Sequence, residues 1–175
     1  MKKLFLAMCI ALVSLNASAQ KGEQNIGAHV LYGTDVKNIG LGAKYQYNVT
    51  DAIRLEAVGD YYLKKDGFSM FDINLNGHYL FPVSDKVTLY PLVGINYTSW
   101  KQDDVFGLGD NGSDDYYEYE SADNPSMSGS SIGLNIGGGV QYKLTNHIRI
   151  GAELKYQTIT GYNSAIIGIG ATFTL

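Results

Sequence analysis

Cysteine is almost absent from this chain of 175 residues, because the only one, Cys9, lies in the N-terminal leader. Disulfides therefore cannot stabilise the domain that follows the leader. Proline is scarce too, with three residues, and no later segment approaches the roughly 18 consecutive apolar residues that a membrane-spanning helix needs. These absences exclude a disulfide framework and a helical membrane anchor after the leader.

The leader predicts export. Lys2 and Lys3 precede an apolar run from Leu4 to Leu15, and Ala17-Ser18-Ala19 supplies small residues for cleavage. We expect residues 1–19 to be a cleaved signal peptide and residues 20–175 to form a single domain. Loss of the two lysines moves the formal net charge from -4 to -6, which argues against nucleic acid as a partner.

Glycine and tyrosine are abundant, at 21 and 14 residues, and this composition favours closely packed strands. Polar and apolar residues alternate with period two almost throughout, which predicts eight β-strands. Pro91, inside one of them, cannot donate to a strand ladder, so we expect a bulge or a missing ladder bond there. The predicted strands are 26–34, 39–49, 53–63, 68–81, 87–100, 131–143, 148–158 and 164–175.

Three of the connections repeat one pattern. The stretches "YNVTDAIRLEA", "YLFPVSDKVTLYP" and "YKLTNHIRIGAE" each place Thr or Ser before Asp or Asn and then resume the alternation. They join strands two to three, four to five and six to seven, whereas the other connections differ in length and composition. Antiparallel hairpins would collect the similar turns at one end and the variable loops at the other.

Each predicted strand has one apolar and one polar face. In segment 53–63, for example, Ile53, Leu55 and Ala57 alternate with Arg54 and Glu56. Alternation alone does not say which face points inward. An apolar interior would make a soluble lipocalin-like barrel, and an apolar exterior would make a barrel in lipid.

Two features favour lipid. Glycine gathers on the polar face, where it relieves crowding inside a small barrel. Aromatic residues of the apolar face gather near the strand ends, as in the girdles at membrane interfaces. One predicted girdle contains Tyr47, Tyr79, Phe81, Tyr142 and Phe173, and the other contains Tyr32, Tyr61, Tyr97 and Tyr156.

The signal peptide, the alternating strands, the three short turns and the final strand "AIIGIGATFTL" resemble the small OmpA/OmpX-like, "porin family" outer-membrane β-barrel proteins. This resemblance implies an all-β, eight-stranded antiparallel up-and-down transmembrane β-barrel in the bacterial outer membrane, with long loops outside the cell. It implies lipid and lipopolysaccharide as partners. It also implies insertion by the barrel-assembly machinery, which reads the last strand.

The polar face carries charges of both signs in similar numbers. This near balance favours a paired network that fills the lumen, and the alternative is a narrow porin-like channel for small solutes or ions. The predicted luminal charges are Lys44, Arg54, Lys143, Arg149 and Lys155 with Glu56, Asp60, Asp72 and Glu153.

No catalytic or metal motif stands out. His29 and His78 fall on the polar face and His147 in a turn, without other ligands at convergent spacing, so we expect no metal and no cofactor. Small barrels that deacylate lipid place a Ser two residues from a His. Here the histidine triplets are "HVL", "HYL" and "HIR", which predicts a protein that is not an enzyme.

The connection over residues 101–130 is long and acidic, with eight carboxylates and Lys101 as its only base. It lacks the register of an EF-hand calcium loop. We expect either a solvated variable loop or a contact surface for an extracellular partner, which gives the protein a structural, adhesion or surface-recognition role. The contact candidates are Asp114, Asp115, Tyr116, Tyr117 and Tyr119.

Overall fold

The computed structural model describes residues 21–65, 67–103, 127–159 and 162–175. Its regular elements are all β-strands, in agreement with the alternation of the sequence. The strands are β1 Gln24–Gly33, β2 Asn38–Asn48, β3 Ile53–Lys65, β4 Phe68–Tyr79, β5 Phe81–Pro82, β6 Val87–Gln102, β7 Met127–Lys143, β8 Ile148–Ile159 and β9 Tyr162–Thr174. No helix long and apolar enough to cross a membrane occurs in these described ranges.

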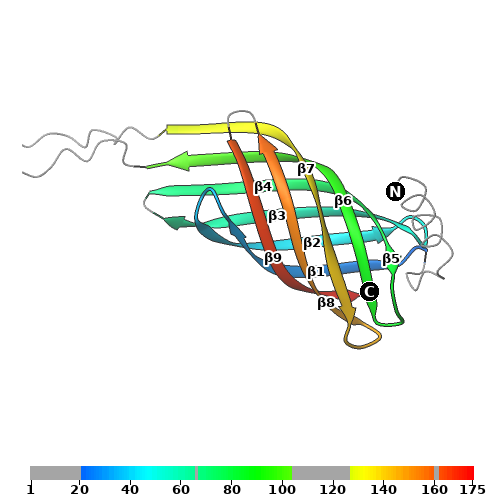
Figure 1. Ribbon diagram of the computed structural model, residues 1–175. Coiled ribbons are helices and arrows are strands. Elements are labelled where there is room, and N and C mark those ends of the chain that lie inside the picture. The colour runs from blue at the N-terminus through cyan, green and yellow to red at the C-terminus, as the bar shows by residue number, and fades with distance from the viewer. Residues whose placement is uncertain (1–20, 66, 104–126, 160–161) are drawn as a thin grey trace, which may run out of the picture.

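The strands form one closed antiparallel sheet (Figure 1). Consecutive strands pair in chain order, β1 pairs with β9, and β6 pairs with both β4 and β5. The two pieces β4 and β5 make up one strand of the barrel, so the predicted fold class, an eight-stranded antiparallel up-and-down barrel, is confirmed. Closure leaves no unpaired sheet edge, which a sheet in lipid requires.

The interruption between β4 and β5 lies opposite Pro91. Pairing between β4 and β6 ends at His78 with Leu92 and resumes as β5 at Phe81 with Leu89, in the same register. On its other side Pro91 pairs with Gly138 without a break. The predicted missing ladder bond therefore falls on the β4 side, and no register shift accompanies it.

The three similar turns are built by the same hydrogen bonds. In the first, the amides of Val49 and Thr50 donate to the Ile53 carbonyl, and the Thr50 hydroxyl accepts from the amides of Ala52 and Ile53. Ser84 in the second turn and Thr145 in the third accept in the same way. The hydroxyl replaces backbone partners that a tight turn cannot supply, which explains why the sequence repeats Thr or Ser there.

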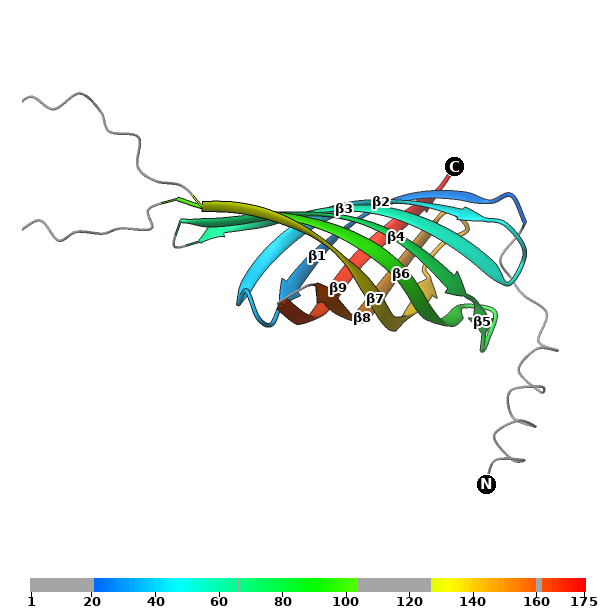
Figure 2. The same cartoon turned by 90° about the horizontal axis from the view of Figure 1, so that it is seen from above.

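The two ends of the barrel differ. At the short-turn end the Gly22 amide donates to the Asn48 carbonyl and the Leu175 amide to the Gln24 carbonyl, so both ends of the described chain lie there. At the other end β3, β4, β6 and β7 project beyond the remaining strands (Figures 1 and 2). Strands β6 and β7 pair out to Gln102 and Met127, further than the predicted strands reached.

The apolar face of the sheet is outside. Leu55, Ile95 and Ile150 are 53%, 52% and 44% exposed, whereas Arg54 is only 2% exposed. A soluble lipocalin-like barrel would bury those three side chains, so that alternative is wrong. The polar face encloses the lumen, and the residues that could carry function meet there.

Candidate functional site

Glu56 on β3 is the centre of one luminal cluster. Its carboxylate lies 3.3 Å from the Lys44 ammonium and 3.5 Å from Nε2 of His78. The amides of Gln46 and Asn76 donate to it at 2.7 Å and 3.2 Å. Four neighbours on the two adjacent strands, β2 and β4, therefore share one buried carboxylate, which offsets the cost of removing it from water.

Asp60, four residues further along β3 and on the same face, is the centre of a second cluster. It pairs with Nε2 of His29 at 2.8 Å and with the Lys155 ammonium at 3.6 Å. The Asn74 amide donates to the same carboxylate at 3.2 Å. Asp72 faces Asp60 across the ladder between β3 and β4 and accepts instead from another residue, Gln157 of β8, at 3.4 Å.

Arg149 links the end of β9 to residues around the start of β1. Its guanidinium donates to Glu23 at 2.9 Å, to Asn25 at 2.8 Å and to the Thr174 hydroxyl at 2.7 Å. These contacts cross the seam where β1 meets β9, the pairing that closes the barrel. We therefore place Arg149 and Glu23 at the closure of the sheet, at its short-turn end.

Arg54 is the most buried of the luminal cations, yet its described hydrogen bonds are to neutral amides. It donates to Asn48 at 2.8 Å and across the lumen to Gln141 at 2.7 Å. A guanidinium held by side-chain amides from β2 and β7 bridges opposite walls. This arrangement fills the bore at the level of Arg54.

A layer of asparagines continues the filling toward the middle of the lumen. The Asn135 amide donates to Asn74 at 2.8 Å and to Asn76 at 3.1 Å, and Asn96 donates to Asn135 at 2.9 Å. All nine predicted luminal charges thus lie on the inner face, Lys143 through its pairing with Arg149 in the ladder between β7 and β8. Glu23 and the asparagine layer extend this network through contacts that the sequence did not predict.

Apolar side chains occupy both ends of the lumen, which the sequence interpretation missed because it treated the inner face as polar and small. Leu31, Tyr62, Met70 and Ile166 pack together near the variable loops, with Val36, Phe68 and Trp100 against them. Leu80, Tyr90 and Leu92 form a second cluster near the short turns. The sequence did hold a signal for them. Even-numbered residues of β3, β4 and β6 point into the lumen, and Tyr62, Met70, Tyr90 and Leu92 are apolar residues at even-numbered positions.

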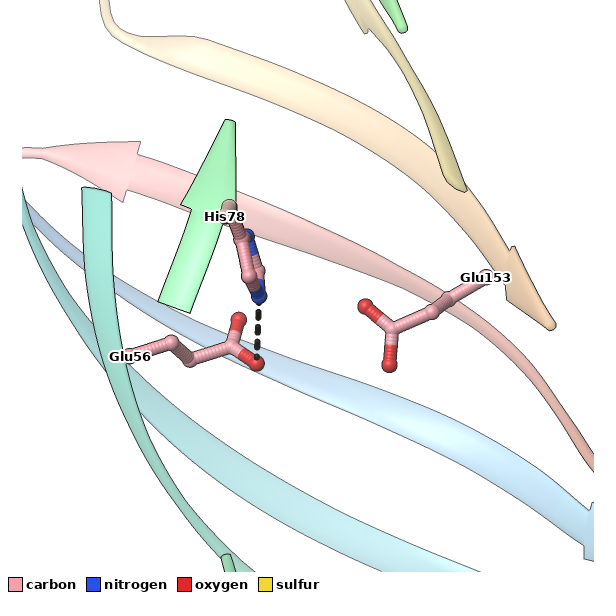
Figure 3. A group of neighbouring side chains, drawn as sticks. All are labelled: Glu56, His78 and Glu153. Atoms are coloured by element: carbon pink, nitrogen blue, oxygen red, sulfur yellow. Dashed lines mark ion pairs between the residues drawn. The ribbon is translucent and has the colours of Figure 1, made fainter. Parts of the chain in front are cut away.

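Glu56, His78 and Glu153 converge although they come from β3, β4 and β8 (Figure 3). One ligand atom from each lies within 4.8 Å of the others. The Tyr90 hydroxyl donates to Glu153 at 3.0 Å, and the Tyr90 ring stacks on His78 with centroids 4.7 Å apart. The sequence had indicated no such convergence, because β8 meets β3 only through closure of the barrel.

The predicted aromatic girdle residues lie on the outer face of the barrel near its two ends. Most are substantially exposed, while Tyr79 and Phe81 are half-buried and contact each other with ring centroids 4.6 Å apart. The five loop contact candidates, residues 114–117 and 119, lie outside the described residues.

The whole domain matches a known family, described as "Outer membrane protein beta-barrel domain", over residues 5–174. The protein belongs to this family. It is an outer-membrane protein, and its apolar outer face lies in lipid, as the resemblance seen in the sequence implied. No match was found among curated proteins.

Solved structures of bacterial outer-membrane barrels share the fold. The N-terminal β-barrel domain of OprF from Pseudomonas aeruginosa is 15% identical with a TM-score of 0.63, and the match covers 89% of this chain and 98% of that one. Ail from Yersinia pestis is 17% identical with a TM-score of 0.60, covering 89% and 100%. Neisserial surface protein A is 15% identical with a TM-score of 0.62, covering 86% and 95%. At these identities the likeness shows the fold alone.

Proposed function

We propose that this outer-membrane barrel is a sealed, non-enzymatic scaffold that presents its 101–130 loop at the cell surface for recognition or adhesion. The observation that carries the proposal is the filling of the lumen. Tyr62 and Met70 pack with Leu31 and Ile166 at the loop end, and all four are buried. A solute crossing the barrel would have to displace this cluster and then the ion pairs below it.

The channel alternative has less support. A cavity beside Lys44 and Glu153 in the lumen measures about 30 Å³, the share of one water molecule. Luminal charges of both signs pair with one another, whereas an ion pathway favours unpaired charge of a single sign. The filled lumen and the paired charges thus favour a structural or surface-recognition role over ion or solute conduction.

The loop chemistry points to a cationic partner. Residues 101–130 contain eight carboxylates and one base, with Tyr116, Tyr117 and Tyr119 beside Asp114 and Asp115. The structural neighbour Ail has been solved in complex with a heparin analogue, sucrose octasulfate. A polyanion of that kind would be repelled by this acidic loop, so we propose a basic protein surface as its partner.

We further propose that lipopolysaccharide contacts the outer aromatic residues at the loop end, and that the barrel-assembly machinery inserts the chain through its last strand. Tyr32, Tyr61 and Tyr97 expose apolar rings with polar tips there, which suits an interface between lipid and water.

Conductance across a planar lipid bilayer tests the sealed scaffold. The purified, refolded protein should give no steady channels. A double variant that removes the end cluster, Tyr62→Ala with Met70→Ala, should give more openings than the native protein and serves as the matched comparison. Steady native channels with a reproducible conductance would show that the barrel is a channel.

Surface proteolysis tests the display of the loop separately. A protease that cleaves after glutamate should cut intact cells' protein at Glu118 or Glu120, because Glu56 and Glu153 are shielded in the lumen. Changing both loop glutamates to glutamine should abolish this cut. Glu23 lies at the short-turn end of the barrel, opposite the 101–130 loop. If the protease cut intact cells' protein only near Glu23, the short-turn end would face outward and the loop would face the periplasm.

A further inference from the structure

Glu56, His78 and Glu153 face one another inside the lumen, and their ligand atoms lie within 4.8 Å of one another (Figure 3). We infer that these three side chains form a binding site for a divalent transition metal of the Zn²⁺ class. One imidazole and two carboxylates are a mixed nitrogen and oxygen donor set. Such a set suits Zn²⁺ better than Ca²⁺ or Mg²⁺, which prefer oxygen ligands alone.

The imidazole of His78 is the independent observation that separates this cluster from an ordinary group of acids. His78 is 2% exposed, and neither of its ring nitrogens makes a hydrogen bond of good geometry among the described residues. Its Nε2 points at Oε1 of Glu56 from 3.5 Å. Buried polar atoms normally have a partner, and a metal on Nε2 supplies one.

Tyr90 holds two of the three ligands in place. Its ring lies nearly parallel to that of His78, with an interplanar angle of 9°, and its hydroxyl donates to Oε2 of Glu153 at 3.0 Å. Outer contacts of this kind orient ligands and raise metal affinity. Tyr90 is a positioning residue here, since it acts through His78 and Glu153.

The local charge leaves room for a cation. The Lys44 ammonium is 3.3 Å from Oε2 of Glu56 and 4.0 Å from Oε2 of Glu153. Two carboxylates face this single ammonium at close range. Lys44 lies against one oxygen of each carboxylate, which leaves Oε1 of Glu153 open. Oε1 of Glu56 faces His78 and accepts from the Asn76 amide at 3.2 Å, and a carboxylate oxygen has a second lone pair for a metal.

The geometry needs one small adjustment. Ligand atoms about 2.0–2.2 Å from a tetrahedral Zn²⁺ lie about 3.3–3.6 Å apart. The pair formed by Glu56 and His78 already fits this spacing at 3.5 Å, so the Glu153 side chain has to swing inward by about 1 Å.

Metal content and a cobalt spectrum test the site in the full mature barrel refolded in detergent. Protein refolded with Zn²⁺ and then dialysed should retain one ion per chain and melt at a higher temperature than protein refolded with a chelator. Co²⁺ in its place should give the visible absorption bands of a four-coordinate ion. Ca²⁺ should produce neither effect.

Variants locate the ion. His78→Gln and Glu153→Gln should each lose it, and Tyr90→Phe should weaken Zn²⁺ binding by about tenfold. His29→Gln is the matched control, because His29 is also luminal but pairs with Asp60 outside the cluster. Heat-dependent mobility on a gel reports folding of every variant, and if His78→Gln does not fold, Glu153→Gln decides.

Three outcomes would overturn the inference. The first is a native barrel that retains no Zn²⁺ after refolding with it. The second is a folded His78→Gln or Glu153→Gln variant that retains as much Zn²⁺ as the native protein. The third is Zn²⁺ binding by Lys44→Met but not by the native protein, which would show that the lysine ammonium is the resident cation of this site.

Discussion

Leu55 and Glu56 are neighbours on β3, yet they belong to surfaces built by opposite rules. Leu55 is half exposed to lipid and needs no specific partner, so the only requirement on an outer-face residue is that its side chain is apolar. Glu56 is buried and is contacted by Lys44, Gln46 and other luminal residues. The comparison teaches that the outer face places the barrel in the membrane, while the lumen decides which side chains meet.

The largest expected effect comes from breaking a luminal pair. Glu56→Leu should lower the free energy of unfolding by about 3–5 kcal/mol, because it leaves the Lys44 ammonium buried without its nearest carboxylate. Urea unfolding in lipid vesicles measures this. The double variant Lys44→Met with Glu56→Leu should recover most of the loss. If the single and the double variant lost equal free energy of unfolding, Lys44 would not depend on Glu56 as its partner.

A charge on the outer face should cost somewhat less and should depend on depth. Leu75 lies mid-strand, pairing with Ala57 and Ile95, so Leu75→Arg should lower the unfolding free energy by about 2–4 kcal/mol. Tyr47→Arg, near the short-turn end, should cost about 0–1 kcal/mol. The same unfolding assay applies, and equal costs at the two depths would argue against lipid around Leu75.

Glycines on the two faces offer a sharper comparison at a smaller scale. A Cβ at Gly42 would clash with the Asp60 carboxylate and the His29 ring, whereas a Cβ at Gly59 meets nothing within 4 Å. Gly42→Ala should therefore cost about 1–3 kcal/mol through overpacking. Gly59→Ala on the outer face should leave stability unchanged, and thermal melting of the two variants side by side is the measurement.

The smallest effect belongs to an ion pair in water. Asp103, directly after β6, accepts from Lys64 at 2.8 Å and pairs with Lys101 at 3.1 Å at the loop-side ends of β3 and β6, and these lysines lower the pKa of its carboxyl. Its contribution is complete at neutral pH and is lost only as the pH falls through that lowered pKa. Asp103→Asn should not change the melting temperature measurably, because both lysines that pair with it are exposed to water, where such ion pairs contribute little.

Most of the fold could be predicted from the sequence because its signals are local. Each signal is contained within a few residues of the chain: period two predicts the strands, Thr or Ser predicts the three short turns, and Pro91 predicts the missing ladder bond. The strand ends beside residues 101–130 were predicted too short, since the residues just outside the predicted strands, "KQ" and "MSGS", carry no clear alternation. Only pairing between β6 and β7 extends the ladder to Gln102 and Met127.

The luminal network could be predicted as a set but not as pairs. Alternation places Glu56, Asp60 and Glu153 on the inner face, and it says nothing about which cation reaches which acid. The inward direction of Tyr62 and Met70 was overlooked, because the inner face was interpreted as polar along its whole length although its ends are apolar. Their inward direction follows from the same parity that turns Asp60 and Asp72 inward.

By itself the sequence determined the strands, the short turns and which residues share a face, because side-chain alternation is a property of each strand alone; glycine and aromatic placement favoured lipid for the apolar face, and the exposure of that face in the closed barrel settled it. Only the closed barrel decided that Glu56 of β3, His78 of β4 and Glu153 of β8 meet, and that apolar clusters stop both ends of the lumen. The physical reason is that contacts across the bore depend on how strands far apart in the chain are staggered when the sheet closes.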